Sequence, residues 1–237
     1  MYRETNGRSL IKTISWRFLA TVTTAILVYL FTKDIDVALK IGGIEIFLKL
    51  VIYYFHERLW NRITFGKKEI PPSVLWFTGL SGAGKSAISE GVYSKLKSRG
   101  LKVEHLDGDV VREIFPKTGF SKEDRDRHVK RVGFLASMLE KNGVIVVASF
   151  ISPYKESRDF VRGLCNNFKE IYVATPLEEC EKRDVKGLYA KARKGEITQF
   201  TGIDDPYEEP VNPEVKVNTT DQTVEQSVQF VLKKLGY

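Results

Sequence analysis

Residues 74–86 read VLWFTGLSGAGKS, a short apolar run followed by a glycine-rich loop. The run VLWFT predicts a buried strand, and GLSGAGKS matches the phosphate-binding loop pattern in full. Glycines free backbone N–H groups to surround phosphates, the lysine reaches the β and γ oxygens, and the serine is suited to Mg²⁺. The stretch therefore predicts a site for ATP and Mg²⁺ at Gly79, Ser81, Gly82, Ala83, Gly84, Lys85, Ser86 and Ala87. The alternative is a glycine-rich turn with an incidental lysine.

From residue 73 onward, short β-branched or apolar runs alternate with amphipathic segments. Strands are expected at 74–78, 102–106, 144–148, 171–174 and 215–217, with helices in most of the segments between them. This alternation is typical of an α/β fold in which a parallel sheet is flanked by helices on both faces. Val224, Val228, Val231 and Leu235 lie at helical intervals and predict a last helix.

Two apolar stretches precede this region, at 18–32 and 37–55, and predict an N-terminal two-helix transmembrane hairpin. Lys and Arg gather before the first stretch and after the second, which under the positive-inside rule places both termini and the following domain in the cytoplasm. The membrane would then be a plasma or inner membrane. A signal peptide and an interfacial or partner-packed helix pair are the alternatives. Residues 64–72, TFGKKEIPP, indicate a break, so the expected domains are 1–66 and 73–237, joined by a linker at 67–72.

The net charge of +7 is unevenly distributed along the 237 residues. Residues 1–68 hold 11 Lys and Arg against 5 Asp and Glu, whereas residues 69–237 hold 26 against 25. The larger domain is nearly neutral, so nucleic acid is not an expected partner. Two cysteines are too few for a disulfide framework or a Cys-rich zinc site.

The end of the second expected strand reads LDGDVVR and holds two carboxylates, Asp107 and Asp109, with Arg112 close behind. Ligands of parallel sheets gather at the carboxyl ends of the strands, so these residues are expected beside the phosphates. A carboxylate can polarise an attacking hydroxyl or help bind Mg²⁺, and an arginine can hold an anion with two hydrogen bonds. The alternative is a turn that caps the next helix.

These motifs, together with GFSKEDRDRHVKR at 119–131, FISPY at 150–154 and KGLYAKARKGEITQFTGIDDPYE at 186–208, resemble the adenylylsulfate (APS) kinase family over residues 73–237. The resemblance implies a P-loop kinase fold, Mg·ATP, and an assembly of two or more copies. It also implies the reaction, in which the ATP γ-phosphate passes to the 3′-hydroxyl of adenosine 5′-phosphosulfate to give PAPS and ADP.

The resemblance further implies roles for individual residues. Lys85 and Asp107 are expected to act in catalysis, as is Ser152 in those accounts that make it a phosphorylated intermediate, although direct transfer is favoured here. Ser86 and Asp107 are expected at the metal. The expected substrate contacts are Asp107, Asp109, Arg112, Phe120, Arg125, His128, Ile151, Ser152, Lys186, Leu188 and Phe200. The basic segment 182–194 is expected to form a lid over the ligands, or otherwise a merely solvated helix.

His128 departs from the pattern, because the family usually has asparagine there, and this leaves open a kinase for another anionic nucleotide. The appended hairpin leaves open a further hypothesis, a catalytically silent nucleotide sensor on the membrane. Separately, RSLIKTISWRFLATVTT and IYYFHERLWNRITFG resemble an uncharacterised family of two-helix membrane domains over residues 7–66, which implies topology and no activity.

Overall fold

A computed structural model describes residues 2–4, 6–31, 35–63, 65, 67–115 and 119–237. These residues form two compact units, Tyr2–Ile70 and Pro71–Tyr237, each described here by itself. The N-terminal unit contains strand β1 (Tyr2–Glu4), helix α1 (Asn6–Phe31), helix α2 (Ile35–Arg62) and strand β2 (Lys67–Glu69). β2 pairs antiparallel with β1, so the segment expected as a linker begins with a short strand. Its partner strand β1 lies far away along the chain, at the start of the unit, so the sequence around β2 carries no local signal for this pairing.

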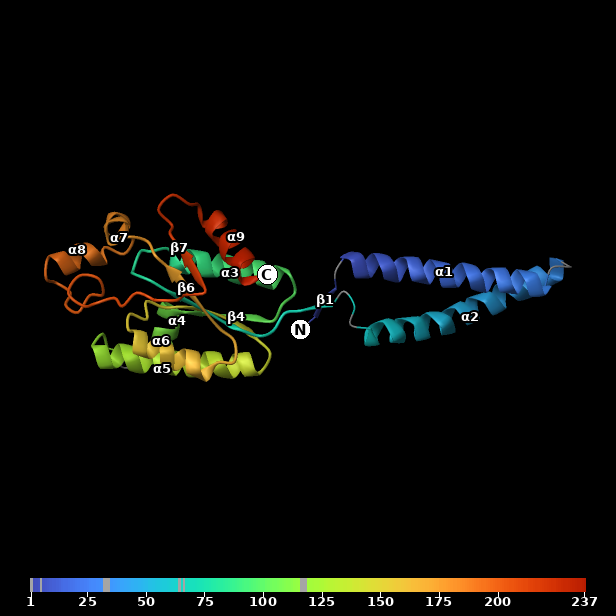
Figure 1. Ribbon diagram of the computed structural model, residues 1–237, viewed down its shortest axis with the longest axis horizontal. Coiled ribbons are helices and arrows are strands. Elements are labelled where there is room, and N and C mark those ends of the chain that lie inside the picture. Colours follow the sequence, from blue (N-terminus) through green and yellow to red (C-terminus); the bar gives the residue numbers. More distant parts are fainter. Residues whose placement is uncertain (1, 5, 32–34, 64, 66, 116–118) are drawn as a thin grey trace. The chain divides into compact units, whose positions relative to one another are not determined.

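Helices α1 and α2 run side by side in opposite directions (Figure 1). Polar contacts join the first turns of α1 to the last turns of α2: Lys12 to Glu57 at 2.7 Å, Ser15 to His56 at 3.0 Å, and Arg8 to the carbonyl oxygens of Ile63 and Phe65 at 2.8 Å each. Among the described residues, Leu10–Val28 is the stretch long and apolar enough to cross a bilayer. The second stretch of the expected hairpin carries Lys40, Glu45 and Lys49 and does not meet that criterion.

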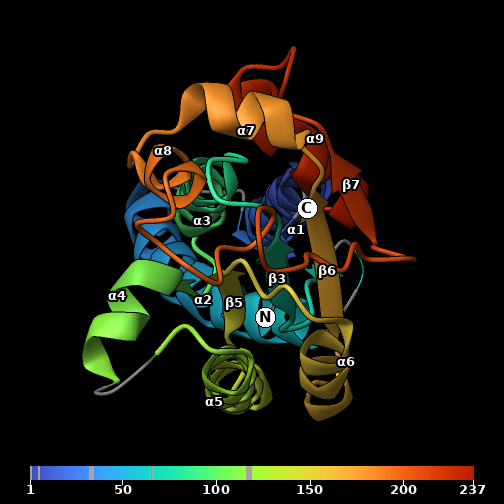
Figure 2. The same cartoon turned by 90° about the vertical axis from the view of Figure 1, so that its left-hand side faces the viewer.

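The C-terminal unit is a five-stranded parallel sheet in the order β4-β5-β3-β6-β7. Helices α5 and α6 cover one face, and α3 and α9 cover the other (Figure 2). The strands are β3 (Val74–Thr78), β4 (Val103–Asp107), β5 (Ile145–Ser149), β6 (Phe168–Val173) and β7 (Val215–Val217). The helices are α3 (Lys85–Ser98), α4 (Gly108–Ile114), α5 (Lys122–Lys141), α6 (Lys155–Leu164), α7 (Leu177–Arg183), α8 (Leu188–Arg193) and α9 (Val224–Leu235).

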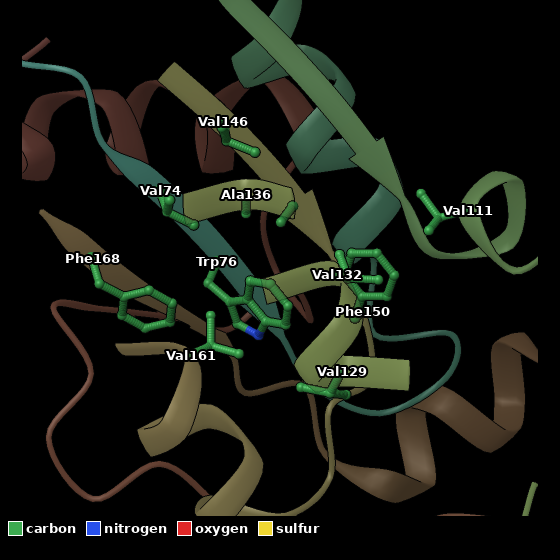
Figure 3. Close-up of a cluster of buried hydrophobic side chains, with 11 residues drawn as sticks. Val74, Trp76, Val111, Val129, Val132, Ala136, Val146, Phe150, Val161 and Phe168 are labelled. Carbon is green, nitrogen blue, oxygen red and sulfur yellow. The ribbon is translucent and has the colours of Figure 1, made fainter. Parts of the chain in front are cut away.

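One hydrophobic cluster fills the space between the sheet and α5 and α6 (Figure 3). Trp76 lies at its centre, fully buried, and stacks on Phe150 with ring centroids 5.3 Å apart. Alternate residues of the central strands point into this cluster, as the period of a β-strand requires. Its members are Val74, Trp76, Val111, Val129, Val132, Ala136, Val146, Ala148, Phe150, Val161 and Phe168.

The structure confirms the expected α/β fold with its parallel sheet. β6 begins at Phe168, three residues before the predicted strand at 171–174. The prediction started late because Lys169 and Glu170 interrupt the apolar run. Glu170 is buried nonetheless, since its carboxylate accepts a 2.8 Å hydrogen bond from Arg158, which is itself 2% exposed. A long-range ion pair therefore allows a charged residue inside a central strand.

Candidate active site

The phosphate-binding loop joins β3 to α3, as its sequence predicted. Gly79, Gly82 and Gly84 have φ values of 148°, 74° and 100°, in the left-handed region that favours glycine. A Cβ on Gly79 would lie 2.5 Å from the carbonyl oxygen of Val173, so the loop also needs glycine for its close approach to β6. The Lys85 ammonium is buried and donates to the carbonyl oxygen of Leu80 at 2.8 Å. It therefore lies against the loop that would surround the phosphates.

Residues far along the chain hold this loop in place, and the sequence analysis missed them. The hydroxyls of Thr175 and Thr219 both donate to the carbonyl oxygen of Ala83, at 2.9 and 3.0 Å. Tyr189 donates to the carbonyl oxygen of Ser81 at 2.9 Å. Such contacts have no signature of spacing, because their partners are brought together only by the tertiary fold. Ser86 and Ala87, at the start of α3, are exposed.

Asp107 is the last residue of β4, at the carboxyl edge of the sheet, where it lies in register with Ser149 of β5. It is half-buried and accepts a 3.5 Å contact from the backbone N–H of Val110, in the first turn of α4. The backbone of Asp109 lies in α4, and its side chain is outside the described residues. Asp107 thus ends its strand at the same edge of the sheet as the phosphate loop.

The loop after β5 is fixed by buried hydrogen bonds. Ser152 is 2% exposed and has a φ of 39°, a strained value for a residue with a side chain. Its hydroxyl accepts from the indole N–H of Trp76 and donates to the hydroxyl of Thr78, both at 3.0 Å. The carbonyl oxygen of Ile151 accepts from Thr78 at 2.7 Å, and that of Ser152 accepts from Arg158 at 2.8 Å. The Ser152 hydroxyl is therefore engaged within the protein.

Arg125 joins two loops that are distant in the sequence. Its Nε donates to the carbonyl oxygen of Phe120 at 2.8 Å, its Nη1 donates to the hydroxyl of Thr201 at 2.7 Å, and its Nη2 donates to the carbonyl oxygen of Gln199. One guanidinium thus brings the backbones flanking Phe120 and Phe200 together. The sequence placed Arg125, Phe120 and Phe200 in one site, and the structure gathers all three.

Arg112 also lies against Phe120. Its guanidinium is 4.7 Å from the ring centroid of Phe120, and it donates to the carbonyl oxygen of Gly119 at 3.1 Å. Phe120 is 61% exposed, and the Arg125 guanidinium lies 5.9 Å from its ring centroid, so an accessible aromatic side chain lies beside two arginines. The Phe200 ring is half-buried and packs edge-on against Tyr189 at 5.0 Å.

His128 lies one helical turn after Arg125 on α5 and is 3% exposed. Its ring packs edge-on against Phe115 and Phe150, at 6.1 and 5.8 Å. Within the described part of the chain, neither ring nitrogen has a hydrogen-bond partner. Burial, with the charges of Arg112 and Arg131, lowers its pKa to about 4. The imidazole is therefore neutral at pH 7 and keeps one donor and one acceptor to offer.

The basic segment 182–194, expected as a lid, consists of the last two residues of α7, a short turn and α8. Gly187 and Gly195 have φ values of 64° and 75° at the two ends of α8. Asp184 caps that helix by accepting from the backbone N–H groups of Tyr189 and Ala190, both at 3.0 Å. Lys186 is exposed and Leu188 is half-buried. The segment is thus anchored to the phosphate loop through Tyr189. Its basic side chains are exposed except Arg183, which is half-buried and donates to the hydroxyl and the carbonyl oxygen of Thr219 at 2.8 and 2.9 Å.

The hydroxyl of Ser86 and the carboxylate of Asp107 are the hard oxygen ligands that Mg²⁺ prefers. Within the described residues, no three His, Cys, Asp or Glu side chains gather into a metal site. Mg²⁺ at nucleotide sites usually binds through one or two protein oxygens, substrate phosphates and water. The residues present fit that mode of binding.

A parallel sheet, a phosphate loop before a helix and an acidic residue at a strand end define a P-loop kinase. The family model described as adenylylsulphate kinase matches residues 71–218, and the chain belongs to that family. A second model, described as a predicted membrane protein (DUF2061), matches residues 10–61.

Curated relatives and solved structures agree with this assignment. An adenylyl-sulfate kinase of a Picosynechococcus species is 57% identical over 162 residues, which cover 68% of this chain and 92% of the relative. A probable adenylyl-sulfate kinase of Pseudomonas aeruginosa is 54% identical over 170 residues, covering 71% and 79%. The Mycobacterium tuberculosis APS kinase, solved with AMPPNP and APS, is 40% identical with a TM-score of 0.68, covering 71% of this chain and all of that one.

Proposed function

We propose that this kinase transfers the γ-phosphate of ATP to the 3′-hydroxyl of adenosine 5′-phosphosulfate, at the carboxyl edge of the sheet. The observation that carries the proposal is the group formed by Arg112, Phe120 and Arg125, where two guanidinium groups lie against an exposed aromatic ring. An acceptor that combines an anion with a purine matches this group, because arginine holds oxyanions and aromatic rings stack on bases.

On the donor side, residues 79–87 bind the phosphates through backbone N–H groups and the positive end of α3. Lys85, which rests 2.8 Å from the carbonyl oxygen of Leu80, exchanges that contact for a β or γ oxygen when ATP binds. Mg²⁺, held by Ser86 and Asp107 with the phosphates, would neutralise charge on the transferring group. The positive charge of Lys85 acts on the same oxygens.

On the acceptor side, Asp107 orients the 3′-hydroxyl and accepts its proton as the hydroxyl oxygen bonds to the γ-phosphorus. The bond from that phosphorus to the bridging oxygen breaks, and ADP leaves. Arg112 and Arg125 hold the phosphosulfate, and two of the five Arg125 N–H donors remain for it after its contacts within the protein. His128 offers a further hydrogen bond beside Arg112, and Asp109 lies close to Asp107 in the chain. Phe120 and Phe200 flank the adenine.

Transfer is direct, without a phosphorylated serine. The Ser152 hydroxyl is buried and makes hydrogen bonds to Trp76 and Thr78, which supports a role in shaping the loop. Phosphoryl transfer needs positioning and charge neutralisation more than a covalent intermediate. Ile151 lines the substrate, and Lys186 and Leu188 belong to the segment that closes over both ligands.

The test is a coupled assay of ADP release with purified full-length chain, with and without APS. We expect turnover that requires APS and is lost in Lys85→Ala, whereas Lys97→Ala, on the exposed side of the same helix, keeps it. Folded protein that shows no APS-dependent turnover would refute the proposal. Turnover of other anionic nucleotides at a comparable rate would favour the broader acceptor hypothesis.

For the N-terminal unit we propose a membrane tether, a two-helix hairpin whose two ends and kinase domain are cytoplasmic. The apolar span Leu10–Val28 and the match of residues 10–61 to a predicted membrane protein family support it. Extraction by alkaline carbonate without detergent would contradict insertion.

We also propose that the kinase assembles with copies of itself. The Thiobacillus denitrificans APS kinase, 35% identical with a TM-score of 0.53 over 70% of this chain and 29% of that one, is hexameric. Light scattering in detergent tests the assembly.

A further inference from the structure

The two ends of the α1–α2 pair differ in charge. Residues 2–17 and 57–70, which form one end, contain eight Lys and Arg against three Asp and Glu. Residues 31–40, which include the last residue of α1 and the first turns of α2, contain two of each sign. The contacts of Lys12 with Glu57 and of Ser15 with His56 bring the first turns of α1 and the last turns of α2 together, so the excess of positive charge is gathered at one end.

Some of these cations serve contacts inside the pair. Arg8 is fully buried and donates to the carbonyl oxygens of Trp60, Ile63 and Phe65, which caps the C-terminal end of α2. Lys12 is paired with Glu57 at 2.7 Å. Arg17, Arg58 and Arg62 have exposed side chains, and we define these three as the basic rim. A guanidinium is planar and matches the geometry of a phosphate group.

Aromatic side chains lie at the same level as the basic rim. Trp16 packs edge-on against Tyr53 at 4.8 Å, and the guanidinium of Arg58 lies 5.4 Å from the ring centroid of Tyr54. Tyr53 and Tyr54 are 46% and 55% exposed. Beyond this level, toward the connection, α1 exposes the apolar side chains Phe18, Val22, Ile26, Val28 and Leu30. Tyrosine and tryptophan between an apolar zone and a basic zone are typical of the headgroup level of a bilayer.

We propose that the basic rim binds the headgroups of anionic phospholipids. The proposal rests on the membrane tether proposed above and adds to it a preference for one lipid class. Arg17 lies within the apolar span Leu10–Val28, and its long side chain reaches back toward the start of α1, to the level of the lipid phosphates. Arg58 and Arg62 on α2 present positive charge at the same end of the helix pair, and the aromatic rings lie between this charge and the apolar zone. A zwitterionic headgroup would gain less, because its own cation opposes the arginines. The tether would therefore hold the kinase at negatively charged membrane surfaces.

The experiment measures quenching of tryptophan fluorescence by brominated lipids in vesicles that contain the full-length chain. Trp16 and Trp60 lie at the basic end of the helix pair, whereas Trp76 is fully buried in the kinase core and gives a constant background. Vesicles mix phosphatidylcholine and phosphatidylglycerol in equal parts, with bromine on one lipid or on the other. The ratio of the two quenching curves gives the relative association of the two lipids with the rim.

We expect phosphatidylglycerol to associate about fivefold more strongly than phosphatidylcholine at low salt, and the preference to decrease as salt is added. The variant Arg17→Gln/Arg58→Gln/Arg62→Gln should bring the ratio to about one. The control Lys97→Gln/Lys233→Gln/Lys234→Gln removes the same charge from exposed positions of the kinase domain and should keep the preference. Both variants should retain APS-dependent turnover, which reports folding.

Equal quenching by the two lipids in the native chain would overturn the proposal, as would a preference that survives in the rim variant. Loss of the preference in the control variant would also overturn it, since the effect would then follow net charge and not the rim. Absence of quenching by either lipid would overturn the membrane tether together with the lipid preference. Quenching by both lipids to the same extent would overturn the lipid preference alone.

Discussion

Replacing Arg125 with lysine tests whether one guanidinium aligns the two loops of the acceptor site. Arg125 is 8% exposed and donates to Phe120, Thr201 and Gln199 from three different nitrogens. Lysine keeps the positive charge but has a single nitrogen, so it cannot reach all three acceptors. At least one loop is then released, while the phosphate-binding loop is not touched directly.

The size of the effect follows from the contacts that are lost. A hydrogen bond from a charged donor contributes about 1.5–3 kcal/mol, and Arg125→Lys removes two of them at minimum. Part of that energy returns as the freed loop rearranges and meets water, which leaves about 3 kcal/mol. In kcat/KM for APS this corresponds to a loss of about 150-fold. Affinity for a non-hydrolysable ATP analogue should change little.

Steady-state kinetics with APS as the varied substrate, together with calorimetry of the ATP analogue, measures both quantities. Arg127→Lys is the matched control, because Arg127 lies on the same helix, is exposed, and pairs only loosely with Asp124 at 3.3 Å. A loss in kcat/KM for APS of less than about threefold would refute the reasoning. An equal loss of ATP affinity would also refute it, because the effect would then not be confined to the acceptor loops.

Three further predictions concern the kinase domain. Because the pKa of His128 in the folded chain is lowered to about 4, the unfolded chain takes up this proton first as the pH falls. The free energy of unfolding should therefore decline between about pH 6.5 and 4, and His128 should account for about 2.5 kcal/mol of the decline at pH 4.5. Urea unfolding of His128→Asn should lack this part of the decline. Gly79→Ala should weaken ATP-analogue binding at least about tenfold by calorimetry, since its methyl group would lie 2.5 Å from Val173 and the loop must shift. Glu170→Gln should lower the free energy of unfolding by about 3 kcal/mol, because Arg158 stays buried without its carboxylate; an unchanged urea midpoint would contradict this.

Burial on α5 shows how far a helical pattern can be read. Arg125, His128 and Val132 are spaced so that they share one side of this helix, and all three are buried, while Arg127 is exposed. The pattern did not indicate what they touch. Arg125 contacts a loop beyond residue 198, and Phe150, the residue after β5, packs on His128.

Sequence alone determined the features whose signal is local. The phosphate loop is a contiguous motif, the strands are short apolar or β-branched runs, and two of the described helices begin at local caps, Ser121 for α5 and the Thr223 and Gln226 capping box for α9. Only the tertiary structure decided the features that depend on partners distant in the chain. Ser152 is buried where it forms hydrogen bonds with Trp76 and Thr78, and Thr219 donates a hydrogen bond to Ala83 of the phosphate loop. The ion pair with Arg158 allows Glu170 to lie inside a strand. The physical reason is that hydrogen bonds and ion pairs form between groups that are close in space, and spacing along the chain does not record that distance.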